Sequence, residues 1–260
     1  MADDVDLESI ARAAMGMSGA DLANMANEAA LVAVRSGHER ITNLDLDAAL
    51  DKVILGGPRQ PPMAEQERRL VANHEAGHAL VAWHTEDADP VRKVSIVGHG
   101  RAGGATTQLP EERKVYSSAY LKARLAALLG GRVAEQVELD EVSTGADADL
   151  AQATKLARRM VTRWGMGNLP PVSYQSDQER PFLGYELATD HALSDETAAS
   201  IDHEVATLLE NEQAHARTVI EDHHDELERV VKLLMEEETV TSDQLRDQLG
   251  PPASETAGGH

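Results

Sequence analysis

The sequence predicts a mainly α-helical protein, in which a helical bundle precedes a larger helical domain with one short β-hairpin. Apolar residues recur every three or four positions along most of the chain, which is the period of an amphipathic helix. Two short β-branched runs, 91–97 and 105–109, are separated by glycines and indicate the hairpin. Glycine and proline interrupt the helical pattern at 56–62. We therefore expect a helical module at 4–56, a linker at 57–64, a helical domain at 65–250 and a disordered tail at 251–260.

The first module has the pattern of three short helices. The first apolar period runs from Leu7, and Gly16 ends it. Ser18 and Asp21 have the spacing of a capping box, in which each residue satisfies a backbone N–H group of the other, and they begin a second helix. The residues from Thr42 to Asp45 repeat this spacing and begin a third.

The larger domain begins with a helix that carries the most informative motif of the chain. The stretch 71–81 reads VANHEAGHALV, and it places His74 and His78 four residues apart on one helical face. One divalent ion can contact both rings there, and Glu75 can act as general base on a water at an open metal position. The alternative is an apolar helix in which H-E-x-x-H occurs by chance.

A third ligand is predicted from the stretch 142–149, which leads into a helix that runs to about Trp164. Asp149 falls on the apolar stripe of this helix, whereas Asp147 falls on another face. A carboxylate that faces the core needs a partner, because burying an unpaired charge is costly, and a metal ion would be such a partner. The alternative is that both aspartates only favour the positive end of the helix dipole.

The remaining segments complete the helical domain. A helix is expected at 117–137, with Gly130 and Gly131 allowing close packing, for which the helix of the motif is one candidate partner. The pattern of 194–237 is too long for one ordinary helix, so a break is placed at 221–224, and Thr241 or Ser242 caps a last helix. The histidines of this region are expected at the surface or between helices and not as ligands: His203, His215, His223 and His224.

Composition excludes several classes of protein and site. The 260 residues contain no cysteine, which excludes disulfides and thiolate zinc clusters. A formal charge of −21, spread along the chain, argues against nucleic acid or an anionic membrane as a direct partner. The sequence lacks both an apolar run of 18 residues and the basic start of a signal peptide, so we expect a soluble chain.

Taken together, these motifs resemble the FtsH family of membrane-anchored AAA zinc proteases. The similarity extends over almost the whole chain and rests on SGADLANMANEAAL (18–31), HEAGHALV (74–81), DPVRKVSIV (89–97), LGGRVAE (129–135), VSTGADADLAQATKLARRMVTRWGM (142–166) and LSDETAASID (193–202). The resemblance implies that 4–56 is an AAA lid and 65–250 a zinc peptidase domain. It implies one Zn²⁺ per chain, bound by His74, His78 and Asp149, with Glu75 as general base and Glu135 orienting a histidine ligand.

The resemblance also implies partners, and the sequence departs from the family pattern in informative ways. Family members form hexamers at the cytoplasmic face of a membrane and degrade unfolded or membrane-extracted polypeptides. This sequence has no G-x-x-x-x-G-K-[ST] loop, so we do not expect ATP to bind this chain alone, and ATP dependence would need a full-length parent. The stretch 103–110 carries Thr107 and Gln108 where the family has bulky apolar residues. Two alternatives remain: a catalytically silent assembly platform, and a stand-alone peptidase that needs no ATPase.

Overall fold

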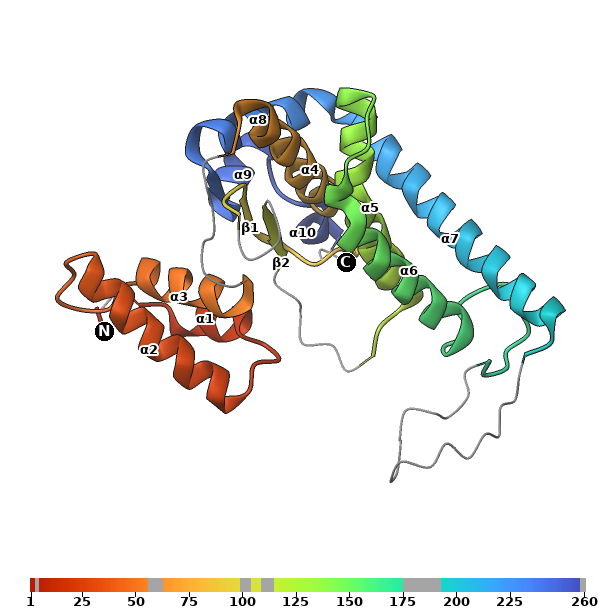
Figure 1. Cartoon of the computed structure of the whole chain (residues 1–260), viewed down its shortest axis with the longest axis horizontal. Coiled ribbons are helices and arrows are strands. Elements are labelled where there is room, and N and C mark those ends of the chain that lie inside the picture. The colour runs from red at the N-terminus through yellow and green to blue at the C-terminus, as the bar shows by residue number, and fades with distance from the viewer. Residues whose placement is uncertain (3–4, 56–62, 99–103, 109–114, 175–192, 258–260) are drawn as a thin grey trace.

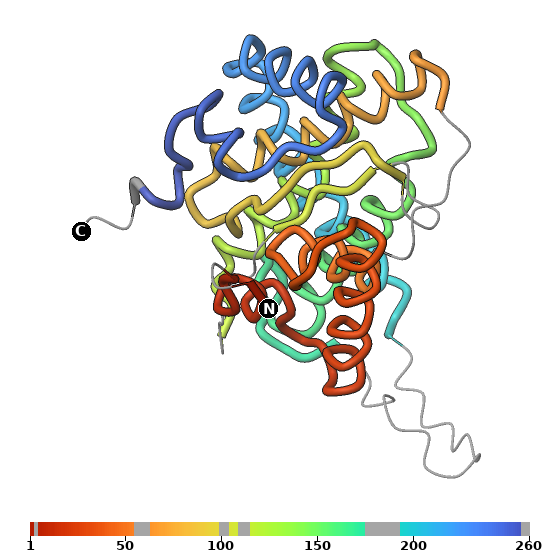
Figure 2. Tube along the Cα trace, turned by 90° about the vertical axis from the view of Figure 1, so that its left-hand side faces the viewer, coloured from red at the N-terminus to blue at the C-terminus, as the bar shows by residue number. Residues whose placement is uncertain are grey.

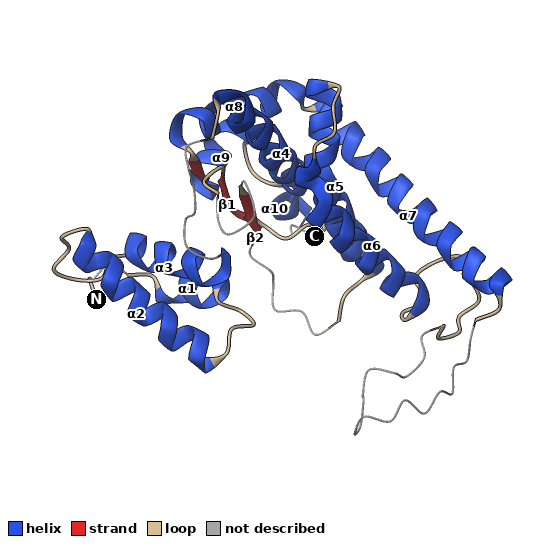
Figure 3. Ribbon diagram, viewed as in Figure 1, coloured by secondary structure: helices blue, strands red, loops and turns tan. Residues whose placement is uncertain are grey.

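The computed structural model describes residues 1–2, 5–55, 63–98, 104–108, 115–174 and 193–257. Helices dominate these ranges and three short strands form one small sheet, which confirms the predicted fold class (Figures 1 and 3). A three-helix bundle at the N-terminus lies to one side of the larger helical domain (Figure 1).

The N-terminal bundle consists of α1 (Leu7–Ala13), α2 (Gly19–Arg35) and α3 (Asn43–Leu55). Ser18 and Asp21 form the predicted capping box at the start of α2, with the Ser18 N–H donating to the Asp21 carboxylate at 2.9 Å. Thr42 and Asp45 make the same exchange before α3. The three helices enclose a small apolar core of their own, formed by Ile10, Ala14, Met25, Ala29, Leu46, Ala49 and Leu50.

The larger domain is built on two packed helices and the elements around them. The central pair is α4 (Glu65–His84) and α5 (Ser118–Leu139). The remaining elements are β1 (Val91–Ser95), β2 (Ala105–Gln108), the 3-10 helix η1 (Thr144–Ala146), α6 (Asp147–Thr162), α7 (Asp195–Asp222), α8 (His224–Glu237), β3 (Thr239–Thr241), α9 (Ser242–Leu249) and α10 (Ala253–Ala257). The break between α7 and α8 falls at His223, within the range expected from the sequence.

The sheet has the order β2–β1–β3, and both pairings are antiparallel. The predicted hairpin is present, and it is joined by β3, which the sequence did not indicate because three residues carry no readable alternation. In Figure 2 the yellow hairpin lies beside the dark-blue C-terminal segment that supplies β3. This order leaves β2 at one end of the sheet.

The helices α4 and α5 pack with almost no space between their backbones. A Cβ added to Gly77 would lie 2.5 Å from the Gly130 carbonyl oxygen, and one added to Gly130 would lie 2.7 Å from the Gly77 carbonyl oxygen. The expected close packing of Gly130 against the motif helix is therefore confirmed. Ala72, Ala76, Ala79 and Leu80 of α4 are fully buried in the resulting core.

The C-terminal segment differs from the predicted disordered tail at 251–260. Residues 253–257 form the short helix α10. The Trp83 indole donates to the Gly250 carbonyl oxygen at 3.1 Å, and Arg246 forms a bidentate ion pair with Glu255, which together hold the segment against the domain. Residues 258–260, and residues 57–62 of the predicted linker, lie outside the described residues.

Candidate metal centre

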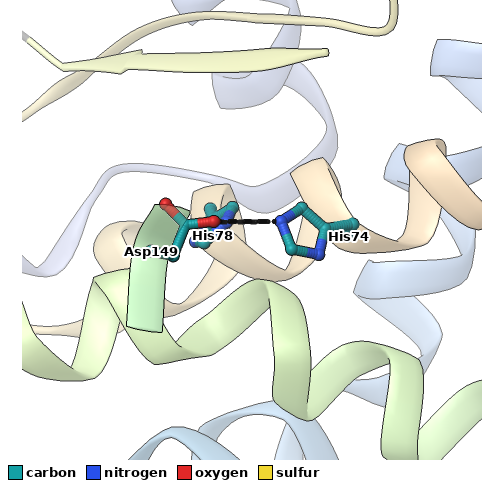
Figure 4. A group of neighbouring side chains, drawn as sticks. All are labelled: His74, His78 and Asp149. Atoms are coloured by element: carbon teal, nitrogen blue, oxygen red, sulfur yellow. Dashed lines mark hydrogen bonds and ion pairs between the residues drawn. The ribbon is translucent and has the colours of Figure 1, made fainter. Parts of the chain in front are cut away.

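Three side chains from two helices converge on one point in the larger domain. His74 and His78 project from α4, and Asp149 projects from the first turn of α6 (Figure 4). The two Nε2 atoms are 3.0 Å apart, and Asp149 Oδ2 lies 3.3 Å from His74 Nε2 and 3.4 Å from His78 Nε2. Such spacing places three donor atoms around one position where an ion can contact all of them.

The position of Asp149 follows from the way α6 begins. Ser143 accepts from the Gly145 N–H, the turn η1 follows, and α6 begins directly at Asp147. Asp149 then faces the imidazoles with its side chain 23% exposed, whereas Asp147 is exposed. The periodicity of the sequence predicted this difference between the two aspartates.

The second nitrogen of each imidazole is held by an acceptor. His74 Nδ1 lies 2.7 Å from Glu135 Oε1, and His78 Nδ1 lies 2.7 Å from the Ala127 carbonyl oxygen. A carboxylate or carbonyl oxygen on Nδ1 requires a proton there, which leaves the lone pair of each Nε2 free for a cation. The approach of the Gly131 N–H to His78 Nδ1, at 3.4 Å, is the longer and weaker contact.

Glu135 is itself firmly held. It is fully buried on α5, and it accepts from the Ser143 N–H at 2.6 Å and from the Ser143 hydroxyl at 2.9 Å. These bonds connect α5, the loop before α6 and the His74 ring into one network. The sequence offered no local signal for Ser143, because its contact with Glu135 exists only after α5 and α6 have packed.

Space beside the Nε2 atoms is kept open by a glycine. A Cβ added to Gly131 would lie 2.5 Å from His78 Nε2 and 2.7 Å from His74 Cε1. Any other residue at position 131 would therefore clash with both rings. Gly131 makes room for the histidine pair, whereas Gly130 allows the two helices to pack closely.

The electrostatics of the cluster favour a cation. Burial disfavours the charged form of His74, but the bonds to Asp149 and Glu135 outweigh burial and raise the pKa of His74 to about 10. Burial also opposes ionisation of Asp149, yet the two imidazoles hold the pKa of this carboxyl well below its ordinary value. A bound cation would take the place of the second ring proton of His74, and two Nε2 atoms with one carboxylate then form a ligand set that zinc accepts, so the residues present fit a zinc ion.

Glu75 follows His74 on α4 and is almost completely buried. Burial raises the pKa of Glu75, although both imidazoles and a hydrogen bond from Thr106 oppose the rise. The Thr106 hydroxyl on β2 donates to Glu75 Oε2 at 2.8 Å. No local pattern could indicate this contact, because it joins a helix to a strand 31 residues further along the chain.

All five predicted site residues thus lie together, while their roles stay predictions. Two further groups of histidine and carboxylate side chains occur in the described residues. One joins His84, His223 and Glu226, and the other joins Glu138, His224 and Glu228. In the first, the rings of His84 and His223 are stacked at 3.6 Å with an interplanar angle of 13°, so their in-plane lone pairs run parallel instead of meeting at one point. The second is largely exposed.

Comparison with known proteins agrees with this geometry. The family described as Peptidase family M41 matches residues 62–248, and the AAA+ lid domain matches residues 4–48. These two matches correspond to the larger domain and to the N-terminal bundle.

Curated relatives cover nearly the whole chain. The ATP-dependent zinc metalloprotease FtsH 4 of Sphaerobacter thermophilus is 44% identical over 97% of this chain and 39% of its own length. ATP-dependent zinc metalloproteases FtsH of Hahella chejuensis and Magnetococcus marinus are 45% and 42% identical over 98% and 99% of this chain, and over 41% and 39% of their own lengths. The chain therefore spans about two fifths of the relatives that it matches. Among the described helices, none combines the length and the apolar character needed to cross a membrane. The chain belongs to peptidase family M41 and carries an FtsH-type metalloprotease domain next to an AAA+ lid domain.

Proposed function

We propose that this chain is a zinc metalloendopeptidase that hydrolyses peptide bonds in unfolded polypeptides. His74, His78 and Asp149 would hold one zinc ion, and Glu75 would serve as general base. The observation that carries the proposal is the convergence of two Nε2 atoms and one carboxylate oxygen within 3.4 Å of one another. A buried carboxylate on the residue next to the first histidine supplies the base.

The chemistry divides between the ion and the chain. When bound, zinc supplies a Lewis acid that polarises a carbonyl group and lowers the pKa of water to about 7. Glu75 takes the proton of the attacking water and then delivers it to the nitrogen of the departing amine. Burial supports this exchange, because it raises the pKa of Glu75 and so makes the protonated acid easier to form. Glu135 and the Ala127 carbonyl keep the two imidazoles oriented throughout.

The end strand of the sheet offers a place for the substrate. An extended peptide can add to the edge of β2 that pairs with no strand in the described part of the chain, through main-chain hydrogen bonds, which do not depend on side-chain identity. Such binding would give broad cleavage of unfolded chains. Thr107 and Gln108 make this strand more polar than the family pattern, so strong preference for apolar side chains is not expected.

The wider setting is proposed from the relatives. They are named ATP-dependent, so we propose that ATP dependence arises in a full-length parent, with this chain alone not binding ATP. We further propose a homo-oligomer, hexameric as in the family, at the cytoplasmic face of a membrane.

Hydrolysis of casein, an unfolded substrate, tests the proposal. We expect cleavage that a zinc chelator abolishes, that added zinc restores, and that Glu75→Gln abolishes while its bound zinc is retained. Glu67→Gln, an exposed residue on the same helix, is the matched control and should cleave like the wild type. Cleavage that survives Glu75→Gln would refute the base assignment, and a chain without zinc or cleavage would favour the silent assembly platform.

A further inference from the structure

We propose that Thr106 is a positioning residue, whose hydroxyl holds the carboxylate of Glu75 in the orientation that a general base requires. This inference rests on the proposed function. It assigns to strand β2 a part in catalysis that is separate from receiving the substrate.

The contact between the two residues is close and double. The Thr106 hydroxyl oxygen lies 2.8 Å from Glu75 Oε2 and 3.0 Å from the Glu75 main-chain oxygen. The hydroxyl has one proton to share between these two acceptors, with the carboxylate oxygen the nearer, and it so holds the carboxylate beside the main-chain oxygen of the same residue. It is also the one donor that the described part of the chain places on this carboxylate.

Gly104, directly before β2, leaves room for the carboxylate on its other side. A Cβ added to Gly104 would lie 2.8 Å from Glu75 Cγ and 2.9 Å from Glu75 Oε1. It would also lie 2.7 Å from the Ser95 carbonyl oxygen on β1, a backbone atom that cannot move cheaply. A side chain at position 104 would therefore collide with the carboxylate, so glycine leaves the space that Glu75 Oε1 occupies, while Thr106 holds the opposite oxygen by hydrogen bonding.

The register of the hairpin explains why Thr106 can do this. Thr106 pairs with Val94 of β1, in the interior of the hairpin ladder, so its backbone is fixed by the sheet. Successive side chains of a strand point to opposite faces, and Thr106 therefore points toward α4 while Thr107 points away from it. An added substrate strand would lie against the other edge of the same residues, so the element that receives the peptide also holds the base.

Two variants separate positioning from ordinary packing. Thr106→Val keeps the branched shape and removes the hydroxyl, and Thr106→Ser keeps the hydroxyl and removes a methyl group. Thr239→Val is the matched control, because it makes the same chemical change on β3 of the same sheet, where the hydroxyl contacts the Ser95 hydroxyl and lies outside the proposed substrate edge. Each chain is assayed with a fluorescence-quenched peptide, and its bound zinc is measured by elemental analysis.

Loss of the hydrogen bond that orients a charged base is expected to reduce the rate of hydrolysis about tenfold or more. We expect Thr106→Val to lower kcat about tenfold or more, with KM within twofold of the wild type and zinc unchanged at one ion per chain. Thr106→Ser should keep at least about half of kcat. Thr106→Ala removes the same hydroxyl without any new group, and takes the place of Thr106→Val if that chain does not fold.

Binding of a peptide hydroxamate gives a readout that is independent of turnover. The O–H group of the hydroxamate is acidic, and a correctly placed Glu75 can accept its proton. Removal of the Thr106 hydroxyl should weaken hydroxamate binding about fivefold or more in the wild-type background and less than twofold in Glu75→Gln, because the hydroxyl acts through that carboxylate.

The inference is overturned if Thr106→Val matches Thr239→Val in kcat, if Thr106→Ser is as impaired as Thr106→Val, or if zinc is lost in proportion to activity. A wild type that binds zinc and cleaves, together with any of these results, leaves the proposed function standing. A wild type that neither binds zinc nor cleaves would overturn both the inference and the proposed function.

Discussion

Glu135 illustrates how a single residue prepares the candidate site without contacting a substrate. Its buried carboxylate accepts from the His74 ring and from two groups of Ser143. Hydrogen bonds to these donors hold the pKa of Glu135 below its ordinary value although burial opposes ionisation, so the residue stays a carboxylate. A charged acceptor on Nδ1 makes the opposite nitrogen of His74 a better ligand.

Removing the charge of Glu135 should therefore weaken zinc binding. We expect Glu135→Gln to reduce zinc affinity about 10- to 100-fold, the range measured when partners of metal-ligating histidines are removed. Competition with a chromophoric chelator measures the affinity. Glu138→Gln, one turn further along α5 and beside His224, is the control and should change the zinc affinity little. Equal affinities for Glu135→Gln and the wild type would show that this carboxylate does not tune the ligand.

Sequence reasoning succeeded at this scale wherever the signal was local. The four-residue spacing of His74 and His78 and the helical period at Asp149 depend on neighbours along the chain. Glu135 entered only through the resemblance to a family. Thr106 and Ser143 could not be predicted, because their contacts are made between elements far apart in sequence.

At the scale of elements, the close packing of α4 against α5 determines how much room surrounds the histidine pair. Gly77 and Gly130 let the two backbones touch, and Gly131, one residue further, leaves room for the imidazoles. A close-packed interface of this kind cannot accept a methyl group without movement of a backbone.

Gly130→Ala should therefore destabilise the domain, even though alanine favours helices. The added Cβ would meet the Gly77 carbonyl oxygen at 2.7 Å. We expect a loss of about 1–3 kcal/mol in the free energy of unfolding, measured by urea denaturation. Gly19→Ala, a helical glycine with open space around it, is the control and should be neutral or stabilising. A Gly130→Ala chain as stable as the wild type would mean that the helices can move apart.

The start of α3 predicts a dependence on pH. Asp45 accepts from the Thr42 N–H at 2.9 Å, the Thr42 hydroxyl at 2.8 Å and His38 Nδ1 at 2.9 Å. The main-chain bond from Thr42, with smaller contributions from His38 and the Thr42 hydroxyl, holds the pKa of Asp45 below its ordinary value of 3.8 although burial opposes it. A lowered pKa in the fold stabilises the folded state above about pH 3.8, and this contribution is lost as the pH falls through the lowered value.

Asp45→Asn should accordingly lower the thermal midpoint of the bundle at pH 7, and its difference from the wild type should shrink as the pH falls below about 4. Circular dichroism follows the unfolding, and hydrogen exchange at 42–55 assigns the change to α3. Glu39→Gln, an exposed charge in the same bundle, should leave the midpoint unchanged. A difference that persists undiminished in acid would contradict the assigned role of the carboxylate.

Helices and their ends could be predicted where the sequence carried a sustained helical period of apolar residues or a capping motif. The helices of the bundle and the break between α7 and α8 followed from these signals. Strand β3 has three residues, and α10 depends on the contact of the preceding Gly250 with Trp83 and on the ion pair of its own Glu255 with Arg246, so neither could be recognised from local pattern.

At the scale of the whole molecule, charge pairs connect the bundle to the sheet. Asp51 of α3 pairs with Arg92 and Lys93 of β1, and Asp47 pairs with Arg92. The carboxylate of Asp51 and both cations are mostly buried, so these pairs are screened less by salt than surface pairs. The bundle is thus joined to the strand that pairs with β2 by ionic contacts as well as by the chain itself.

The proposed chemistry depends on the convergence of side chains from two helices on a single ion. Bound zinc per chain, measured after dialysis for the wild type and for His78→Ala, Asp149→Asn and Glu75→Gln, tests it most directly. We predict one zinc ion in the wild type and in Glu75→Gln, and little or none in the two ligand variants. Full zinc content in Asp149→Asn or His78→Ala would contradict the proposed site.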